Sequence, residues 1–156
     1  MIGFGYDVHK LGPGESLVLG GVKLESKLGT VAHSDGDVLL HAIMDALLGA
    51  LALGDIGLHF PDTSSKWHGA DSIELLKHVH QLIRNEGVHI VNIDSTVVLE
   101  SPRLRPHIDA MRERIAEALA LDVKRVSIKA TTNERLGFIG REEGVAAYAV
   151  VQVEED

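Results

Sequence analysis

Hydrophobic and polar residues alternate along the first strand that the sequence predicts. The two sets that alternate are Ile2, Phe4, Tyr6 and Val8 on one side and Gly3, Gly5, Asp7 and His9 on the other. A period of two is typical of a half-buried strand. Because side chains two residues apart on a strand point the same way, we expect Asp7 and His9 to share a face.

Further apolar and β-branched runs predict four more strands. They cover residues 17–24, 88–100, 125–131 and 145–153. Within the first of these runs, Gly20 and Gly21 indicate a bulge or a close backbone approach. The last run is apolar on both faces as far as Val151. It is therefore expected to pack against helices on one side and against a second subunit on the other.

Helical spacing predicts three main helices. They cover residues 37–53, 71–86 and 106–119. The first is apolar almost all round, with Ser34 and Asp35 as capping candidates, so it is expected to be buried. The segments 54–68 and 132–143 are expected to be loops. The order ββααβαββ predicts an α/β (α+β) fold over residues 1–156, a single domain in which three main helices pack on a mixed sheet.

Composition narrows the possible chemistry. The 156 residues contain no cysteine, which excludes disulfides, zinc ribbons, iron–sulfur clusters and thiolate nucleophiles. Any metal must therefore be held by His, Asp or Glu. The formal net charge of -8 argues against a general nucleic-acid partner. We also find no secretory signal and no membrane segment, and so expect a cytoplasmic protein with no membrane partner.

The charge is unevenly distributed along the chain. Residues 101–141 contain nine Lys or Arg and five Asp or Glu, a net charge of +4, which leaves -12 for the remainder. Arg103 and Arg105 flank the turn before the third helix, where a guanidinium group could pair with a phosphate. The alternative is an ordinary solvated surface.

Asp7, His9 and His41 form the strongest candidate site. One carboxylate and two imidazoles leave a fourth position open, which is the pattern of a catalytic zinc site. The same set suits non-haem Fe(II). Asp37 and Asp45, four residues to either side of His41, are candidates to orient its imidazole. The alternative is a hydrogen-bonded pair at the strand end and a histidine satisfied within the core.

A second polar cluster follows a predicted strand. Hydroxyls and a carboxylate at residues 131–134 could hold a hydrated divalent ion and the phosphates it bridges, or simply form a polar hairpin loop. His33 precedes the cap of the first helix, near where an anion would meet the helix dipole. The other histidines are expected to be surface or packing residues: His59, His68, His78, His80, His89 and His107.

Four motifs occur in order along the chain: GYDVH at 5–9, AHSDGDVLLH at 32–41, GDIG with FPDT at 54–63, and KATTNE with GF at 129–138. In sequence and spacing they resemble the 2-C-methyl-D-erythritol 2,4-cyclodiphosphate synthase family. The resemblance implies a metal-dependent phosphorus–oxygen lyase of the non-mevalonate isoprenoid pathway. Its substrate would be 4-diphosphocytidyl-2-C-methyl-D-erythritol 2-phosphate, and its products the 2,4-cyclodiphosphate and CMP.

The resemblance also implies roles for individual residues. Asp7, His9 and His41 would bind Zn²⁺, Glu134 would bind Mg²⁺ or Mn²⁺, and His33 and Thr132 would support the transition state. The implied substrate contacts are Asp7, Val8, His9, His33, Ser34, Asp55, Ile56, Gly57, Phe60, Pro61, Asp62, Thr63, Ser64, Arg103, Leu104, Arg105, Ala130, Thr131, Thr132, Asn133, Glu134, Phe138 and Arg141.

Finally, the resemblance implies a homotrimer with its active sites between subunits. One subunit would supply the zinc ligands, while Arg103 and residues 130–132 of its neighbour would line a cytidine pocket. Tyr6, Phe138 and Arg141 would line a central cavity that can hold an isoprenoid diphosphate.

Overall fold

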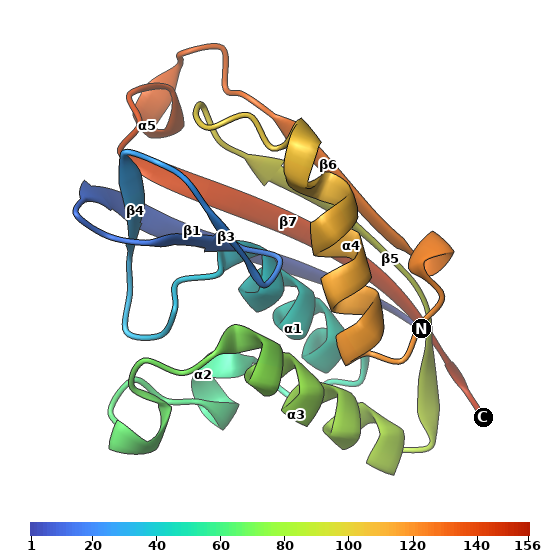
Figure 1. The fold of residues 1–156 in the computed structure, drawn as a ribbon. Helices are drawn as coiled ribbons and strands as arrows, with labels where there is room; N and C mark the ends of the chain where they lie inside the picture. The colour runs from blue at the N-terminus through green and yellow to red at the C-terminus, as the bar shows by residue number, and fades with distance from the viewer.

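The computed structural model describes residues 1–156 and places five strands in one sheet (Figure 1). They are β1 (Ile2–Pro13), β4 (Leu28–Val31), β5 (Val88–Val98), β6 (Val126–Thr131) and β7 (Gly144–Glu155). Their order across the sheet is β4-β1-β7-β5-β6. Only β5 and β6 run parallel, and the other neighbours are antiparallel. The predicted mixed sheet is therefore confirmed.

The segment 17–24 forms a separate two-stranded hairpin. In it, β2 (Leu17–Leu19) pairs antiparallel with β3 (Val22–Leu24). Gly20 and Gly21 have φ angles of 59° and 73°. Two consecutive residues with positive φ make a tight turn, so the predicted bulge and single strand are wrong. The short strand β4 was not predicted either, because four residues are too few to establish a period.

The three predicted main helices are confirmed as α1 (Val38–Ala50), α3 (Ser72–Asn85) and α4 (Ile108–Ala118). The cap of α1 is Asp37, whose side chain accepts from Leu40 N, so the capping candidates Ser34 and Asp35 are wrong. The segments expected to be loops contain short helices, α2 (Ile56–His59), η1 (Ser65–Trp67) and α5 (Gly137–Gly140), and the 3₁₀ turns η2 (Arg105–His107) and η3 (Val123–Arg125) flank α4. None of the helices is long and apolar enough to span a membrane.

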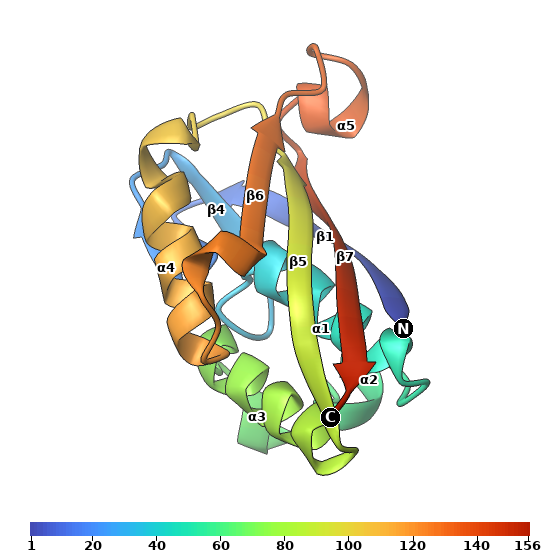
Figure 2. The ribbon, with the colours of Figure 1, turned by 90° about the vertical axis from the view of Figure 1, so that its right-hand side faces the viewer.

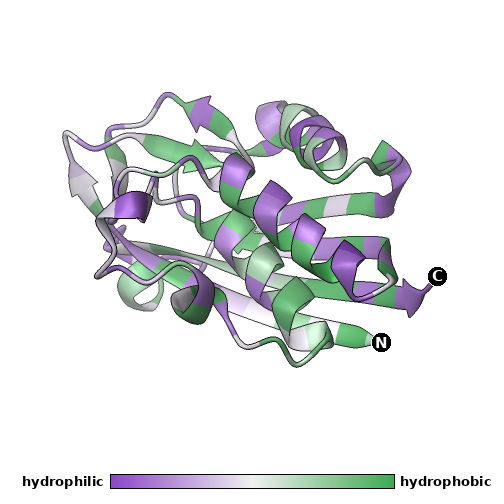
Figure 3. Cartoon of the chain, turned by 90° about the horizontal axis from the view of Figure 1, so that it is seen from below, coloured by the Kyte–Doolittle hydropathy of each residue, from purple (hydrophilic) through white to green (hydrophobic).

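Helix α1 lies between the sheet and α3. It contacts β1 and β7 on one side and α3 on the other. This position explains why it is apolar almost all round, since nearly every side chain meets protein. Helix α3 has solvent on its outer side and is amphipathic, with hydrophilic and hydrophobic residues alternating along it in Figure 3. The polar faces of α3 and α4 thus form the outside of this layer.

The inner face of β1 packs on α1 through glycine. A Cβ atom on Gly3 would lie 1.8 Å from the carbonyl oxygen of Ala46, and one on Gly5 would lie 1.9 Å from that of Ala42. No side chain fits between the helix and the strand at these positions. The helix therefore rests directly on the strand backbone, and the side chains of Asp7 and His9 continue this inner face.

The side chains on the outer face of β1 are apolar and exposed. We define the outer face as Ile2, Phe4, Tyr6 and Val8 of β1 with Tyr148 and Val150 of β7, all of them at least 41% exposed. Tyr6 pairs with Tyr148 and Phe4 with Val150 across the two strands. Figure 2 shows β5 and β7 in front of α1, and the short helix α5 covers this side of the sheet at one end, where Ile139 packs with Val98 and Ala146. The apolar half of the alternating pattern thus faces outward.

Candidate active site

The side chains of Asp7, His9 and His41 meet where β1 passes α1. Asp7 Oδ2 lies 3.0 Å from His9 Nδ1 and 3.1 Å from His41 Nδ1. One possible ligand atom from each residue lies within 4.8 Å of the other two, and no other group of three such side chains exists in the structure. The predicted convergence of these three residues is confirmed.

This donor set fits a metal ion. A tetrahedral zinc ion with bonds of about 2.0 Å has ligand atoms about 3.3 Å apart, close to the two contacts observed here. His9 Nδ1 is buried without a hydrogen-bond partner. This nitrogen faces Asp7 Oδ2, toward the centre of the cluster. Two imidazoles and a carboxylate are also the donors that zinc prefers when cysteine is absent.

Electrostatic interactions among these three side chains shift the pKa values of Asp7 and His41. Burial alone would raise the pKa of Asp7, but hydrogen bonding and attraction to the two imidazoles lower it to about 2. Burial alone would lower the pKa of His41, yet the hydrogen bond and charge of Asp7 raise it. The Nδ1 proton of His41 therefore occupies the position that a metal ion would take, and it would be released when the metal binds.

The carboxylates of the two aspartates predicted to orient His41 form no hydrogen bond with its imidazole. Asp37 accepts hydrogen bonds from the backbone N–H groups of residues 20, 21 and 40. Asp45 accepts from Ile56 N at 2.8 Å. That prediction is wrong, because both carboxylates join α1 to neighbouring backbone turns. His41 Nε2 instead lies 3.1 Å from Ser72 Oγ and 3.3 Å from Ser34 Oγ.

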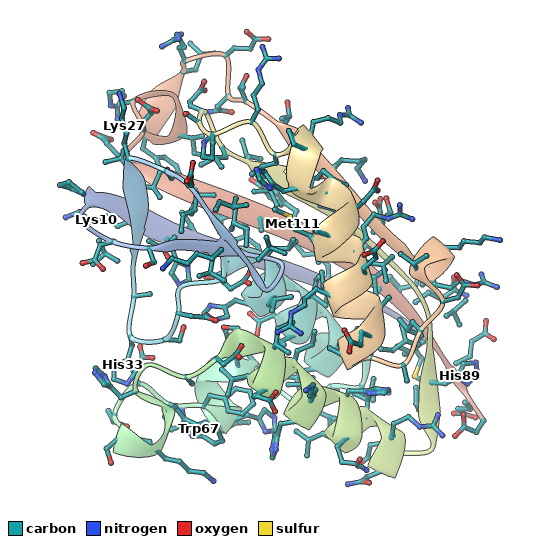
Figure 4. All side chains as sticks on the ribbon, viewed as in Figure 1. Lys10, Lys27, His33, Trp67, His89 and Met111 are labelled. Atoms are coloured by element: carbon teal, nitrogen blue, oxygen red, sulfur yellow. The ribbon has the colours of Figure 1, made fainter.

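A cavity of about 470 Å³, here called the first cavity, opens beside these residues. It brings together ten of the predicted site residues: Asp7, Val8, His9, His33, Ser34, His41, Ile56, Gly57, Phe60 and Asp62. Lys10 and Trp67 also line it and were not predicted. Figure 4 shows Lys10, His33 and Trp67 at the same end of the molecule. The segment expected to be a loop, with α2 and η1, forms one wall of this cavity.

His33 has one nitrogen available in the first cavity. Its Nε2 is buried and has no hydrogen-bond partner. Its Nδ1 lies 3.4 Å from His68 Nδ1, and its carbonyl oxygen accepts from Gly69 N. His68 is exposed, as expected of a surface residue, but it also holds His33. Because 35 positions separate the two residues, no local pattern could have indicated this contact.

A second cavity of about 570 Å³ lies between β6 and the start of α4. It brings together another six predicted site residues: Arg103, Leu104, Arg105, Ala130, Thr131 and Thr132. No residue lines both cavities. The remaining predicted site residues line neither: Asp55, Pro61, Thr63, Ser64, Asn133, Glu134, Phe138 and Arg141. One chain therefore carries two separate groups of candidate residues.

Glu134 stands on an exposed loop that Glu100 organises. Glu100 Oε1 accepts from Asn133 N at 2.9 Å and from Arg135 N at 3.1 Å. Glu134 has a φ of 53°, and its backbone N–H donates to Thr132 Oγ1. Within the chain no other carboxylate or imidazole joins it in a group of metal ligands. Any cation at Glu134 would therefore take its other ligands from water, substrate or another subunit.

Comparison with known proteins decides the family. The model of the YgbB family matches residues 1–154. The chain belongs to the YgbB family. A relative from Symbiobacterium thermophilum, named 2-C-methyl-D-erythritol 2,4-cyclodiphosphate synthase, is 60% identical over 153 residues, which is 98% of each chain. The resemblance seen in the four sequence motifs is confirmed.

Solved structures of YgbB-family relatives share the fold. The chain superposes on the bifunctional IspDF from Campylobacter jejuni with a TM-score of 0.96 and 46% identity, over 99% of this chain and 42% of that one. It superposes on a 2C-methyl-D-erythritol-2,4-cyclodiphosphate synthase in a CDP-bound form with a TM-score of 0.92 and 37% identity, over 99% of this chain and 100% of that one. The single-domain α+β fold is thus common to this chain and its relatives.

Proposed function

We propose that this YgbB-family protein converts 4-diphosphocytidyl-2-C-methyl-D-erythritol 2-phosphate to 2-C-methyl-D-erythritol 2,4-cyclodiphosphate and CMP. One observation carries the proposal: a cluster of two imidazoles and a carboxylate opens into a cavity in a chain whose curated relatives bear that enzyme's name. In the reaction, an oxygen of the 2-phosphate bonds to the β-phosphorus. The bond from that phosphorus to the CMP oxygen breaks, and CMP leaves with the electron pair.

Two cations take part in this proposal. Asp7, His9 and His41 would hold zinc, and Glu134 would hold Mg²⁺ or Mn²⁺. When bound, the cations supply positive charge that offsets the repulsion between the two reacting anionic phosphates. The donor set of the first group supports this assignment, since its three possible ligand atoms lie within 4.8 Å of one another.

The residues of the chain position the substrate. Phosphoryl transfer asks a protein mainly for positioning and charge stabilisation. His33 Nε2 is buried and unpartnered in the first cavity, so it can donate a hydrogen bond to a phosphate oxygen. Thr132 offers a hydroxyl in the second cavity, beside Arg103 and Lys129. His33 and Thr132 are thus the proposed catalytic residues, one in each cavity.

The separation of the two cavities supports a homotrimer with shared active sites. In this arrangement the first cavity of one subunit faces the second cavity of its neighbour, where Arg103 and residues 130–132 would hold the cytidine. The outer face supplies an apolar surface for assembly, since soluble monomers rarely expose contiguous apolar patches of this kind. Phe138 and Arg141 would then line a central cavity able to take an isoprenoid diphosphate. A cytoplasmic location stays a prediction.

Phosphorus NMR tests the proposed reaction. The purified protein, supplied with the diphosphocytidyl substrate, zinc and magnesium, should release CMP and a cyclic diphosphate in equal amounts. Glu134→Gln should raise the magnesium concentration needed for half-maximal rate and leave zinc binding intact. His89→Ala, at the opposite end of the molecule from His33 in Figure 4, is the matched control and should behave as the unaltered protein. CMP release without a cyclic product, or no release at all, would refute the proposal.

A further inference from the structure

Asp35 and Ser72 form a short relay behind the metal-binding histidine. Ser72 N donates to Asp35 Oδ2 at 2.9 Å, and the Ser72 hydroxyl donates to Asp35 Oδ1. Asp35 is itself held in place, because its Oδ1 accepts from Asp37 N and its N–H donates to the carbonyl oxygen of Ala70. Ser72 is fully buried, and its Oγ lies 3.1 Å from His41 Nε2.

These contacts determine that Nε2 of His41 keeps its proton when a metal displaces the proton that Nδ1 shares with Asp7. An ionised carboxylate only accepts hydrogen bonds, so the hydroxyl proton of Ser72 points toward Asp35. Ser72 Oγ is then left to accept a hydrogen bond from His41 Nε2. A neutral imidazole has a single proton, and with that proton on Nε2 the lone pair lies on Nδ1. Nδ1 is the nitrogen that faces Asp7.

Ser34 offers the other hydroxyl near His41 Nε2, at 3.3 Å. It is a weaker candidate for holding the imidazole. Its oxygen already accepts from Gly36 N at 3.2 Å, and no carboxylate fixes the direction of its hydroxyl proton. It is also less buried than Ser72, which is closed off from solvent. The proton of His41 Nε2 is therefore assigned to Ser72.

We propose that Asp35 and Ser72 are positioning residues for the metal centre, holding His41 in the tautomer whose Nδ1 binds zinc. This inference rests on the metal site of the proposed function. It assigns to Asp35 and Ser72 the part that the sequence assigned to Asp37 and Asp45. Since Asp35 belongs to the same turn as His33 and Ser34, the relay also fixes the position of that turn relative to the metal.

Zinc affinity tests the relay directly. The dissociation constant is measured by competition with a chromophoric chelator, after thermal melting has shown that each variant is folded. We expect Ser72→Ala and Asp35→Asn each to weaken zinc binding by about 10- to 100-fold, the usual cost of removing the hydrogen-bond partner of a metal-binding histidine. Ser95→Ala is the matched control, because Ser95 is a buried serine that donates to a backbone carbonyl far from the metal centre. It should bind zinc within twofold of the unaltered protein.

A double variant separates a relay from two unrelated structural roles. If Asp35 acts through Ser72, Ser72→Ala/Asp35→Asn should lose about as much affinity as the worse single variant. Losses that multiply would overturn the proposal, as would a folded Ser72→Ala that binds zinc as tightly as Ser95→Ala. If Ser72→Ala does not fold, Asp35→Asn is judged by the same comparison with Ser95→Ala. The visible spectrum of the cobalt-substituted protein should also change in the relay variants and not in the control.

The same measurements keep this proposal distinct from the proposed reaction. An unaltered protein that binds zinc at one ion per chain but releases no CMP would refute the reaction, while the affinity comparison would still decide the relay. An unaltered protein that binds no zinc would overturn the metal centre, and the relay with it.

Discussion

The two faces of β1 carry opposite kinds of side chain and serve different purposes. The inner face consists of Gly3 and Gly5 followed by Asp7 and His9, and it meets α1 within the same chain. The outer face presents aromatic and aliphatic side chains to the outside of the sheet. A strand of this kind is half-buried in the chain alone, and the buried half is the polar one. Hydrophobic alternation therefore shows that two faces differ without showing which face the chain itself covers.

The largest expected effect comes from the inner face. His9→Ala removes one of the three proposed metal ligands and should lower turnover by more than the roughly 100-fold that loss of a ligand's hydrogen-bond partner costs. Zinc content, measured by elemental analysis of the purified protein, should fall with it. Ile2→Ala, on the outer face of the same strand, should keep its zinc. A His9→Ala protein with full zinc and full turnover would show that the inner face is not the metal site.

The next effect concerns the outer face. Phe4→Asp places a charge among apolar side chains, and Phe4 is 62% exposed in the single chain. The fold and zinc binding should survive, whereas the proposed trimer should dissociate and turnover should fall, because burying an unpaired charge at an interface is costly. Light scattering after size exclusion measures the assembly. Gln81→Asp, which places the same charge on the exposed side of α3, should remain trimeric. An intact Phe4→Asp trimer would separate the outer face from assembly.

A smaller effect tests the close packing of the inner face. In Gly5→Ala the new methyl group would lie 1.9 Å from the carbonyl oxygen of Ala42, so the backbones must move apart. We expect a loss of about 3 kcal/mol in the free energy of unfolding, the upper end for overpacking, and a melting temperature lower by roughly 10 °C. Gly49→Ala is the control, because Gly49 lies in α1, the helix that contains Ala42, and has room for a methyl group. Equal melting temperatures would mean that the helix does not rest on the strand backbone.

The smallest effect is a pH dependence of zinc binding. The pKa of His41 is raised above its usual 6.5, and a metal must displace the Nδ1 proton. As the pH falls through the pKa of His41, protons should therefore compete more strongly with zinc for Nδ1. The apparent dissociation constant for zinc should rise by up to about tenfold per pH unit for one proton displaced. The carboxyl group of Asp7, with its pKa near 2, stays ionised between pH 8 and pH 5. A flat profile in chelator competition across this range would contradict binding of zinc through His41.

Local patterns predicted the metal ligands and the main elements. The spacing of two in Asp7 and His9, and an isolated imidazole on an apolar helix, are signals carried by a few neighbouring residues. The three main helices and the mixed sheet also follow from periodicity. Segments that are too short to show a period, such as β4 and α2, were not predicted. A bulge was predicted at Gly20 and Gly21, where the structure has a two-residue turn, because both features use glycine.

The residues that support the site could not be predicted in the same way. His41 and Ser72 lie 31 positions apart, and the contact depends on how α3 docks beside α1. Proximity in sequence favoured Asp37 and Asp45, which lie on the same face of the helix as His41. Both carboxylates are nevertheless used by backbone N–H groups. Asp37 and Asp45 are therefore unavailable to His41 because they bind backbone N–H groups of neighbouring turns. No pattern within one helix shows those groups.

The position of α1 between the sheet and α3 has a consequence for how the metal centre exchanges with solvent. Ten residues of α1, including His41, are buried. Amides in such a helix exchange their hydrogens only when most of the domain opens, whereas exposed loops open locally at little cost in free energy. The helix therefore cannot unwind by itself to release His41. A metal ion held by the proposed site would therefore be expected to enter and leave through the first cavity, past the segment that carries α2 and η1.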